Sequence, residues 1–399
     1  MRAVPGRGGV PATSARARRR RRVLGAVAVA GLAVAAWAVR DVPAALGRLP
    51  GGARADRVRR SPQFRAGAFQ NPVSTRTMLP GTGREMLRDL LLGGQSRRPG
   101  GSVPVLVPDA APPASTPAGE LGVIWYGHAS ALIEIEGRRV LVDPVWSDRC
   151  SPSTLVGPRR LHPVPVPLDR LPRLDAILIS HDHYDHLDMA TVRALRHGQS
   201  ASFLVPLGVG AHLERWGVPP HRIVELDWTE RATVAGLDFT AAPARHFSGR
   251  GLVRDRTLWG SWVISGRHRR VFCSGDSGYF DGYAEIGTRH GPFDVTLMQV
   301  GAYAVAWPNI HMVPEEAVTA HLDLRGGLLV PVHWGTFNLA PHAWTEPVDR
   351  LWREAKARGV RLAVPRPGER VIVDHPPPVD GWWQALGRPD RAAPVSGSA

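Results

Sequence analysis

The 399-residue chain contains a single lysine, Lys356, and only two cysteines, Cys150 and Cys273. Two cysteines cannot form a disulfide framework, and neither has the spacing of a metal ligand. The sequence therefore excludes a disulfide-rich scaffold and a cysteine-based zinc site. Cys273 lies in the apolar run 271–273, where we expect a small buried side chain. The shortage of lysine indicates a coding bias, because arginine supplies the positive charge instead.

The formal net charge of +15 is concentrated near the amino terminus. Residues 1–60 hold 14 arginines and two aspartates, a net charge of +12, so the other 339 residues carry only about +3. A body that binds nucleic acid would need a basic surface of its own. The charge distribution therefore argues against nucleic acid as a partner.

A basic leader, residues 1–22, ends in five consecutive arginines and is followed by 17 apolar residues at 23–39. This order is typical of a signal peptide or signal anchor, near the lower length limit for crossing a bilayer. Ala36–Ala38 offers a cleavage site, and the arginines loosely fit a twin-arginine signal. An internal buried helix is the alternative. We expect a membrane-associated or exported protein with its body outside the cytoplasm, the cytoplasmic face of the membrane being the other option.

The remaining chain divides by composition. Residues 40–118 are rich in proline, glycine and arginine and predict a linker and irregular arm with one short helix near 83–92. From residue 119 to 375 expected strands and helices alternate, which predicts a layered α/β domain, and 376–399 form a tail. The expected strands are 123–126, 131–135, 139–142, 176–180, 239–242, 258–264, 271–274, 294–300 and 328–332, and the expected helices are 189–196, 208–216, 314–324 and 343–358.

The most informative segment is His181-Asp-His-Tyr-Asp-His186, directly after an expected strand. Imidazole nitrogens and carboxylate oxygens are the ligands that zinc and similar divalent ions prefer. One tight turn can aim His181 and His183 at one ion, while Asp185 and His186 face a second position close by. A solvated polar loop is the alternative, but three histidines and an aspartate in six positions predict metal chemistry.

Three more polar residues, His246, Asp276 and His333, each follow an expected strand. Loops at strand ends gather at one edge of a sheet layer, so we expect these residues to join segment 181–186 in one site. Any one histidine after a strand is more often structural. The three together, in this order, favour a single metal site.

This order of residues resembles the metallo-β-lactamase-fold superfamily. Further strings make the chain similar to N-acylphosphatidylethanolamine-hydrolysing phospholipase D and its bacterial relatives, over roughly residues 60–375. These strings are Trp125–Ser130, Asp143–Trp146, Ser151–Ser153, Trp259–Trp262, Gly291–Asp294, Gly301–Tyr303, Pro314–Ala317 and His333–Phe337. Residues 304–310, just before His311, depart from the phospholipase pattern.

The resemblance implies an α/β fold, a four-layer αββα sandwich with two zinc ions at its edge, manganese or iron being alternatives. Five imidazoles and two carboxylates suit a pair of borderline divalent ions. The implied ligands are His181, His183 and His246 for one ion and Asp185, His186 and His333 for the other, with Asp276 bridging both.

Two neighbouring ions can lower the pKa of a shared water and neutralise the oxygens of a displacement. The resemblance therefore implies a dinuclear zinc hydrolase that cleaves phosphodiesters, with phospholipids as substrate and the membrane as partner. It gives Asp185 and His311 parts in the reaction, His311 through substrate contact or proton transfer. Two alternatives stay open: a lactonase or ester hydrolase with the same metal site, and a non-catalytic metal-binding envelope protein.

Several neighbouring residues have weaker signals. We expect His128 near the site, whereas His311 could equally be a loop histidine before a helix. Asp188 either orients a ligating histidine or caps the helix that begins at Met189. The remaining nine histidines, among them His162, His212, His268 and His321, are expected on the surface or in packing, and Trp125, Trp259, Trp262 and Trp334 in the core and groove wall.

The leader leads to a prediction about location. The full chain should fractionate with membranes, and a chain beginning at residue 41 should not, because 17 mostly small apolar residues supply a modest insertion energy. Protease digestion of intact spheroplasts should reach the body. A full chain that stays soluble in the cytoplasm would contradict the anchor hypothesis.

Overall fold

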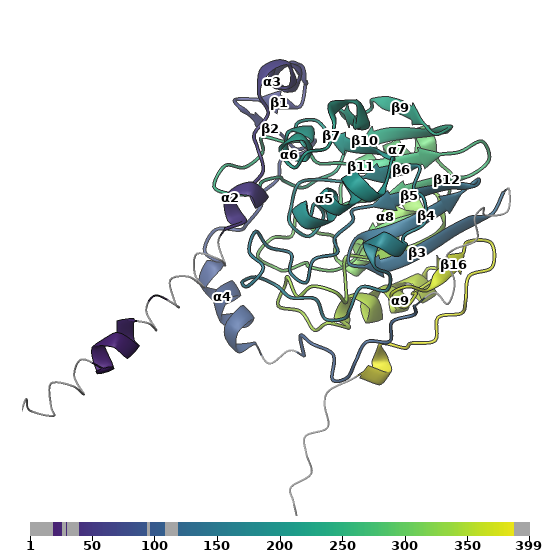
Figure 1. The fold of residues 1–399 in the computed structure, drawn as a ribbon. Coiled ribbons are helices and arrows are strands. Elements are labelled where there is room, and N and C mark those ends of the chain that lie inside the picture. Colours follow the sequence, from purple (N-terminus) through teal and green to yellow (C-terminus); the bar gives the residue numbers. More distant parts are fainter. Residues whose placement is uncertain (1–18, 26–28, 30–39, 94–95, 108–118, 387–399) are drawn as a thin grey trace, which may run out of the picture.

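The computed structural model describes residues 19–25, 29, 40–93, 96–107 and 119–386. Two mixed sheets of seven strands each lie face to face within the described chain, and helices cover their outer faces (Figure 1). The α/β fold expected from the sequence is confirmed, with its layers in the order α, β, β, α.

The first sheet is formed mainly by the first half of the body. It is antiparallel from β16 through β5 and parallel from β5 through β8. Its strands in spatial order are β16 (Arg370–Ile372), β3 (Leu121–Gly127), β4 (Ser130–Ile135), β5 (Arg138–Val142), β6 (Ala176–Leu178), β7 (Ser202–Pro206) and β8 (Ile223–Leu226).

The second sheet repeats this arrangement with the second half of the body. It is parallel from β15 through β12 and antiparallel from β12 through β9, so two similar halves face each other. Its strands in spatial order are β15 (Arg361–Leu362), β14 (Gly326–Val332), β13 (Phe293–Gln299), β12 (Arg270–Cys273), β11 (Ser261–Ser265), β10 (Leu237–Ala242) and β9 (Arg231–Val234).

Helices complete the outer layers on both sides (Figure 1). The first sheet is covered by α5 (Met189–Gly198) and α6 (Gly210–Arg215), and the second by α7 (Gly282–His290), α8 (Pro314–Asp323) and α9 (Glu346–Ala357). Short 3-10 turns occur at η1 (Leu168–Arg170), η2 (Pro220–Arg222) and η3 (Gln384–Leu386).

The largest core lies between the two sheets and continues beneath α7, α8 and α9. Strand β3 is buried at every residue, as a strand covered on both faces must be, which explains its continuous apolar sequence. Phe239 and Trp262 from the second sheet are fully buried in this core. Burying each such side chain contributes about 1.5–3 kcal/mol to folding.

The arm contains more structure than the single helix we expected. Besides α4 (Gly83–Leu92), it has α2 (Val42–Ala45), α3 (Gly52–Arg60) and the hairpin β1 (Phe64–Arg65) and β2 (Ala68–Phe69). Ala45, Val58 and Phe69 are buried. Arg54 of α3 binds Glu214 at 2.8 Å and Glu225 at 2.5 Å. These contacts attach the start of the arm firmly to the body.

Most of the apolar run 23–39 lies outside the described residues, which include only 23–25 and 29 of it. Within the part of the chain that is described, none of the helices has the length and apolar character needed to cross a membrane.

Most expected elements differ from the observed ones by one to three residues at an end, and three of them serve as examples. The strand expected at 258–264 begins only at Ser261, because the preceding residues form a loop in which the Gly260 amide donates to the Ser180 carbonyl, 3.0 Å away. The strand expected at 176–180 ends at Leu178. The helix expected at 343–358 begins at Glu346.

The described part of the tail packs against the largest core, beside α9. Trp383 is fully buried, packs edge-on against Trp334 and Trp352, and donates its indole N–H to Asp349 at 2.8 Å. Replacing Trp383 by alanine should lower the free energy of unfolding by about 3–5 kcal/mol, because it opens a cavity beside Trp334. Chemical denaturation measures this loss. Leu252→Ala, at a fully exposed position, is the control and should change the free energy of unfolding by less than about 0.5 kcal/mol. Equal losses of stability in the Trp383 and Leu252 variants would contradict the packing role of Trp383.

Candidate metal centre

The loop between β6 and α5 carries the histidine-rich segment, residues 181–186. Strand β6 ends at Leu178, and Asp188 caps α5 by accepting a hydrogen bond from the Ala190 amide, 3.2 Å away. Asp188 also accepts from Ser147 and Thr191. Of the two roles open for Asp188, the structure therefore supports the helix cap.

Three imidazoles converge as one group. Nε2 of His181 lies 2.8 Å from Nδ1 of His183, which lies 3.2 Å from Nε2 of His246. Ligands of a tetrahedral zinc with bonds of about 2.0–2.1 Å stand roughly 3.3 Å apart. Both distances are slightly shorter than this, so a small expansion of the group would give the spacing of a three-histidine site.

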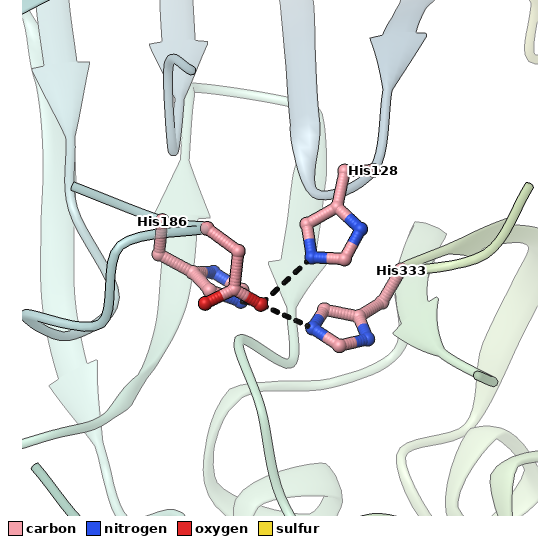
Figure 2. A group of neighbouring side chains, drawn as sticks. His128, His186 and His333 are labelled. Atoms are coloured by element: carbon pink, nitrogen blue, oxygen red, sulfur yellow. Dashed lines mark hydrogen bonds and ion pairs between the residues drawn. The ribbon is translucent and has the colours of Figure 1, made fainter. Parts of the chain in front are cut away.

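A second group lies beside the first and includes Asp185, His186 and His333. Figure 2 shows His128 and His333 turned toward His186 and bonded to one carboxylate. That carboxylate is Asp185, whose Oδ2 is 2.9 Å from Nε2 of His128 and 3.2 Å from Nε2 of His333. His128 is thus placed in the site, where we expected it, and contacts a candidate ligand directly.

Asp276 stands between the two groups. Its carboxylate oxygens lie 3.2 Å from Nε2 of His186 and 3.1 Å from Nε2 of His333. On the other side they lie 3.9 Å from Nε2 of His181 and 3.8 Å from Nε2 of His246. Four of the six other candidate ligands therefore lie within 4.0 Å of this carboxylate, and His183 and Asp185 adjoin them in the two groups.

The histidine tautomers suit metal binding. Nδ1 of His186 donates to Asp143 at 2.8 Å, Nδ1 of His246 donates to the Ile310 carbonyl at 3.0 Å, and Nδ1 of His181 contacts Ser180 at 3.0 Å. Each Nε2 then carries a lone pair toward the cluster, as metal-ligating histidines require. Nε2 of His186 and Oδ1 of Asp276 are buried without a hydrogen-bond partner. A cation between such atoms would satisfy both, so the donor set fits divalent metal ions.

Burial and mutual charge set the protonation of the cluster. Burial opposes ionisation of Asp276, but the neighbouring imidazoles of His186 and His333 hold its pKa well below the usual range. Burial would lower the pKa of His333, but Asp276 and Asp185 outweigh it and raise that pKa to about 9. Burial lowers the pKa of His311 to about 4. The two carboxylates are therefore anionic and favour cation binding.

Backbone geometry brings these side chains together. His128 and His333 both have positive φ, 52° and 66°, and the His333 amide donates to the His128 carbonyl at 2.9 Å. Such strained residues persist only where surrounding structure holds them, and they cluster at functional sites. A Cβ on Gly275 (φ 55°) would approach the Gly260 carbonyl to 2.8 Å, so only glycine lets the backbone pass beside Asp276.

Asp143 had no expected role, and the structure places it beneath the cluster. Its carboxylate accepts from the amide and hydroxyl of Ser180 at 2.6 and 2.7 Å and from His186 at 2.8 Å. It therefore orients His186 and the start of the metal-binding loop together. Its position in Asp143–Trp146, one of the strings that carried the resemblance, was the available signal. The four tryptophans expected in the core are all buried there.

Two pockets meet at His311. A cavity of about 380 Å³ exposes the cluster through His183, Asp185, His246 and Asp276. A second cavity of about 930 Å³ lies between α4 and residues 303–308. The imidazole of His311 lines both, and its Nδ1 lies 4.0 Å from Asp276.

Comparison with known proteins agrees with this geometry. A family model described as "Beta-lactamase superfamily domain" matches residues 138–334. "N-acyl-phosphatidylethanolamine-hydrolyzing phospholipase D 1" of Caenorhabditis elegans is 36% identical over 247 residues, 59% of this chain and 69% of that protein. The chain belongs to the metallo-β-lactamase superfamily of metal-dependent hydrolases. The resemblance inferred from the sequence is thereby confirmed.

Other relatives extend the comparison. An uncharacterized protein of Mycobacterium tuberculosis is 52% identical over 367 residues, 90% of this chain and 98% of that protein. A metallo hydrolase of Ignicoccus hospitalis shares the fold with a TM-score of 0.50 and 23% identity, covering 63% of this chain and 97% of that one. A stretch of 93 residues, 23% of this chain, is 45% identical to 70% of "Outer membrane protein RomA" of Klebsiella pneumoniae.

Asp276 and His311 should respond differently to mutation. Asp276→Ala removes the carboxylate shared by both groups, so metal affinity should fall by more than the roughly 10–100-fold typical when a residue supporting a ligand is lost. His311→Ala should keep the metal content. Elemental analysis of the purified variants measures both, and equal metal loss in the two would show that His311 is a ligand.

Proposed function

We propose that this metal-dependent hydrolase binds two zinc ions and cleaves phosphodiester bonds, with phospholipids as its substrate class. The observation that carries the proposal is the position of the Asp276 carboxylate between two separate histidine groups. One anionic group shared in this way favours a pair of ions over a single one. Bound zinc ions supply Lewis acidity and a nucleophile drawn from water at neutral pH.

Residues around the ions have separable tasks. Asp185 is held by His128 and His333, which fixes its carboxylate toward the second group. His311 is neutral at pH 7 because burial depresses its pKa. A neutral imidazole beside the cluster can accept a hydrogen bond from substrate or exchange a proton with a leaving group.

The pockets favour a long substrate with an anionic centre. Arg254 lies at the mouth of the smaller cavity, with its guanidinium 5.1 Å from the Phe247 ring, and supplies positive charge beside the cluster. The larger cavity has an apolar wall that includes Leu79, Met86 and Val305. A phosphodiester at the metals with an apolar chain in the larger cavity would use both. The name of the Caenorhabditis elegans relative supports the same substrate class.

A membrane surface is the proposed location of the substrate. Met78 and Val305, which line the cavities, are 50% and 87% exposed, and Leu92 at the end of α4 is 79% exposed. Apolar side chains around a cavity mouth can enter a lipid surface, while arginines of residues 40–60 are attracted to anionic head groups. The name of the Klebsiella relative points to the same location.

The same metal site could also serve a carbon ester, lactone or lactam. A substrate panel separates these: bis-p-nitrophenyl phosphate and phospholipids against a lactone and a chromogenic β-lactam. We expect the purified protein to turn over phosphodiesters at least about 100-fold faster than the others, since paired ions neutralise phosphoryl charge best. Thorough chelation should abolish this activity, and zinc or manganese should restore it.

His311→Ala should lower phosphodiester turnover by roughly 10²–10⁴-fold, the usual contribution of acid–base catalysis, at unchanged metal content. Preference for the lactone or β-lactam would overturn the substrate class. Undiminished activity after chelation would overturn the metal mechanism, and metal binding without any turnover would favour the envelope protein.

A further inference from the structure

Arg250 is a buried arginine outside the candidate ligand set, 5% exposed, in the loop that also carries His246. All of its hydrogen-bond acceptors are backbone carbonyl oxygens. Nη1 donates to the carbonyls of Asp182 and Leu187, both at 2.7 Å, and Nε donates to the carbonyl of Ala45 at 2.8 Å. Burying a cation costs free energy unless hydrogen bonds compensate for the lost water, so a buried arginine at this position is expected to have a specific role.

The first two acceptors lie near the two ends of segment 181–187, which supplies four candidate ligands. Asp182 follows His181, and Leu187 follows His186, so one guanidinium holds both ends of the metal-binding loop. The ring of Tyr184, in the middle of the loop, packs under the guanidinium at 4.1 Å, and its hydroxyl donates to the Arg250 carbonyl at 2.7 Å.

The loop carrying His246 makes further bonds to the same segment. The Asp182 carboxylate accepts from the Gly249 amide at 2.7 Å and from the Thr257 hydroxyl at 2.8 Å. It also accepts from Nε2 of His212 at 3.2 Å, and Nδ1 of that histidine accepts from the Arg48 amide at 3.0 Å. His212 is therefore part of this network and not a surface residue.

The third acceptor of Arg250 links the network to the arm. Ala45 lies at the end of α2, and Trp216, which stacks 5.0 Å from the Arg250 guanidinium, donates to the neighbouring Ala44 carbonyl at 2.8 Å. Arg250 thus joins three segments that are far apart in sequence: the arm, loop 181–187 and the loop carrying His246.

We propose that Arg250 is a positioning residue that fixes His181 and His183 against His246, so that the first ion finds its three ligands already aligned. The inference rests on the proposed metal centre. Only a planar guanidinium can reach three carbonyls in different directions, because a lysine ammonium offers a single point of attachment.

The test compares metal binding by Arg250→Met, Arg250→Lys and the control Arg256→Met, an exposed arginine of the same loop. Zinc affinity of each folded full-length protein is measured by competition with a chelator, and the visible spectrum of the cobalt(II) form reports ligand geometry. We expect Arg250→Met to weaken binding of the ion held by His181, His183 and His246 by about 10–100-fold and to alter the spectrum. Arg250→Lys should lose less, and Arg256→Met should match the wild type.

Thr257→Val provides a second test in case the Arg250 variants do not fold. It removes one hydroxyl and keeps the side-chain shape. It should weaken zinc binding about fivefold, the equivalent of one hydrogen bond. The inference would be overturned if the folded Arg250 variants kept wild-type zinc affinity and an unchanged cobalt spectrum. If the Arg250 variants do not fold, the same result for Thr257→Val would overturn it. In both cases the proposed function would stand. A wild-type protein that binds no metal would overturn both.

Discussion

The arrangement of the candidate metal centre depends on one buried carboxylate. Asp276 is 3% exposed, and its oxygens lie within 4.0 Å of five histidines that arrive from four different loops. An isolated anion at such a depth would be prohibitively costly, so its surroundings must supply positive charge. Imidazoles supply part of it, but several of them are held neutral by burial. Under the proposed function, bound divalent ions would complete the balance, and the αββα layers bring these loops to one edge.

Residues outside the candidate ligand set orient several of the candidate ligands. Asp143 sets the tautomer of His186, the Ile310 carbonyl sets that of His246, and His128 holds Asp185. These partners fix the direction of each lone pair before an ion arrives, which lowers the cost of assembling the site. The arm belongs to the same system, because its backbone at Ala45 and Arg48 is bonded to Arg250 and His212. A segment that resembled a linker therefore contributes to the rigidity of the centre.

The sequence predicted several buried elements, because β3 and β14 carry continuous apolar runs and α9 a clear apolar face. It missed β7, β8, β15 and β16, the edge strand β9, which alternates between exposed and half-buried residues, and α7, which has a weak apolar pattern. The candidate ligands were visible because they follow strands in a recognisable order. Apart from His128, their supporting partners were not, since Arg250 and His212 reach the metal-binding loop through contacts with Asp182 across 68 and 30 positions.

Anomalous X-ray diffraction at the zinc edge, from crystals of the zinc-loaded protein, would show directly whether Asp276 joins two metal ions. We expect two peaks in each molecule: one among His181, His183 and His246, the other among Asp185, His186 and His333, with Asp276 contacting both. A single peak, or peaks away from Asp276, would contradict it.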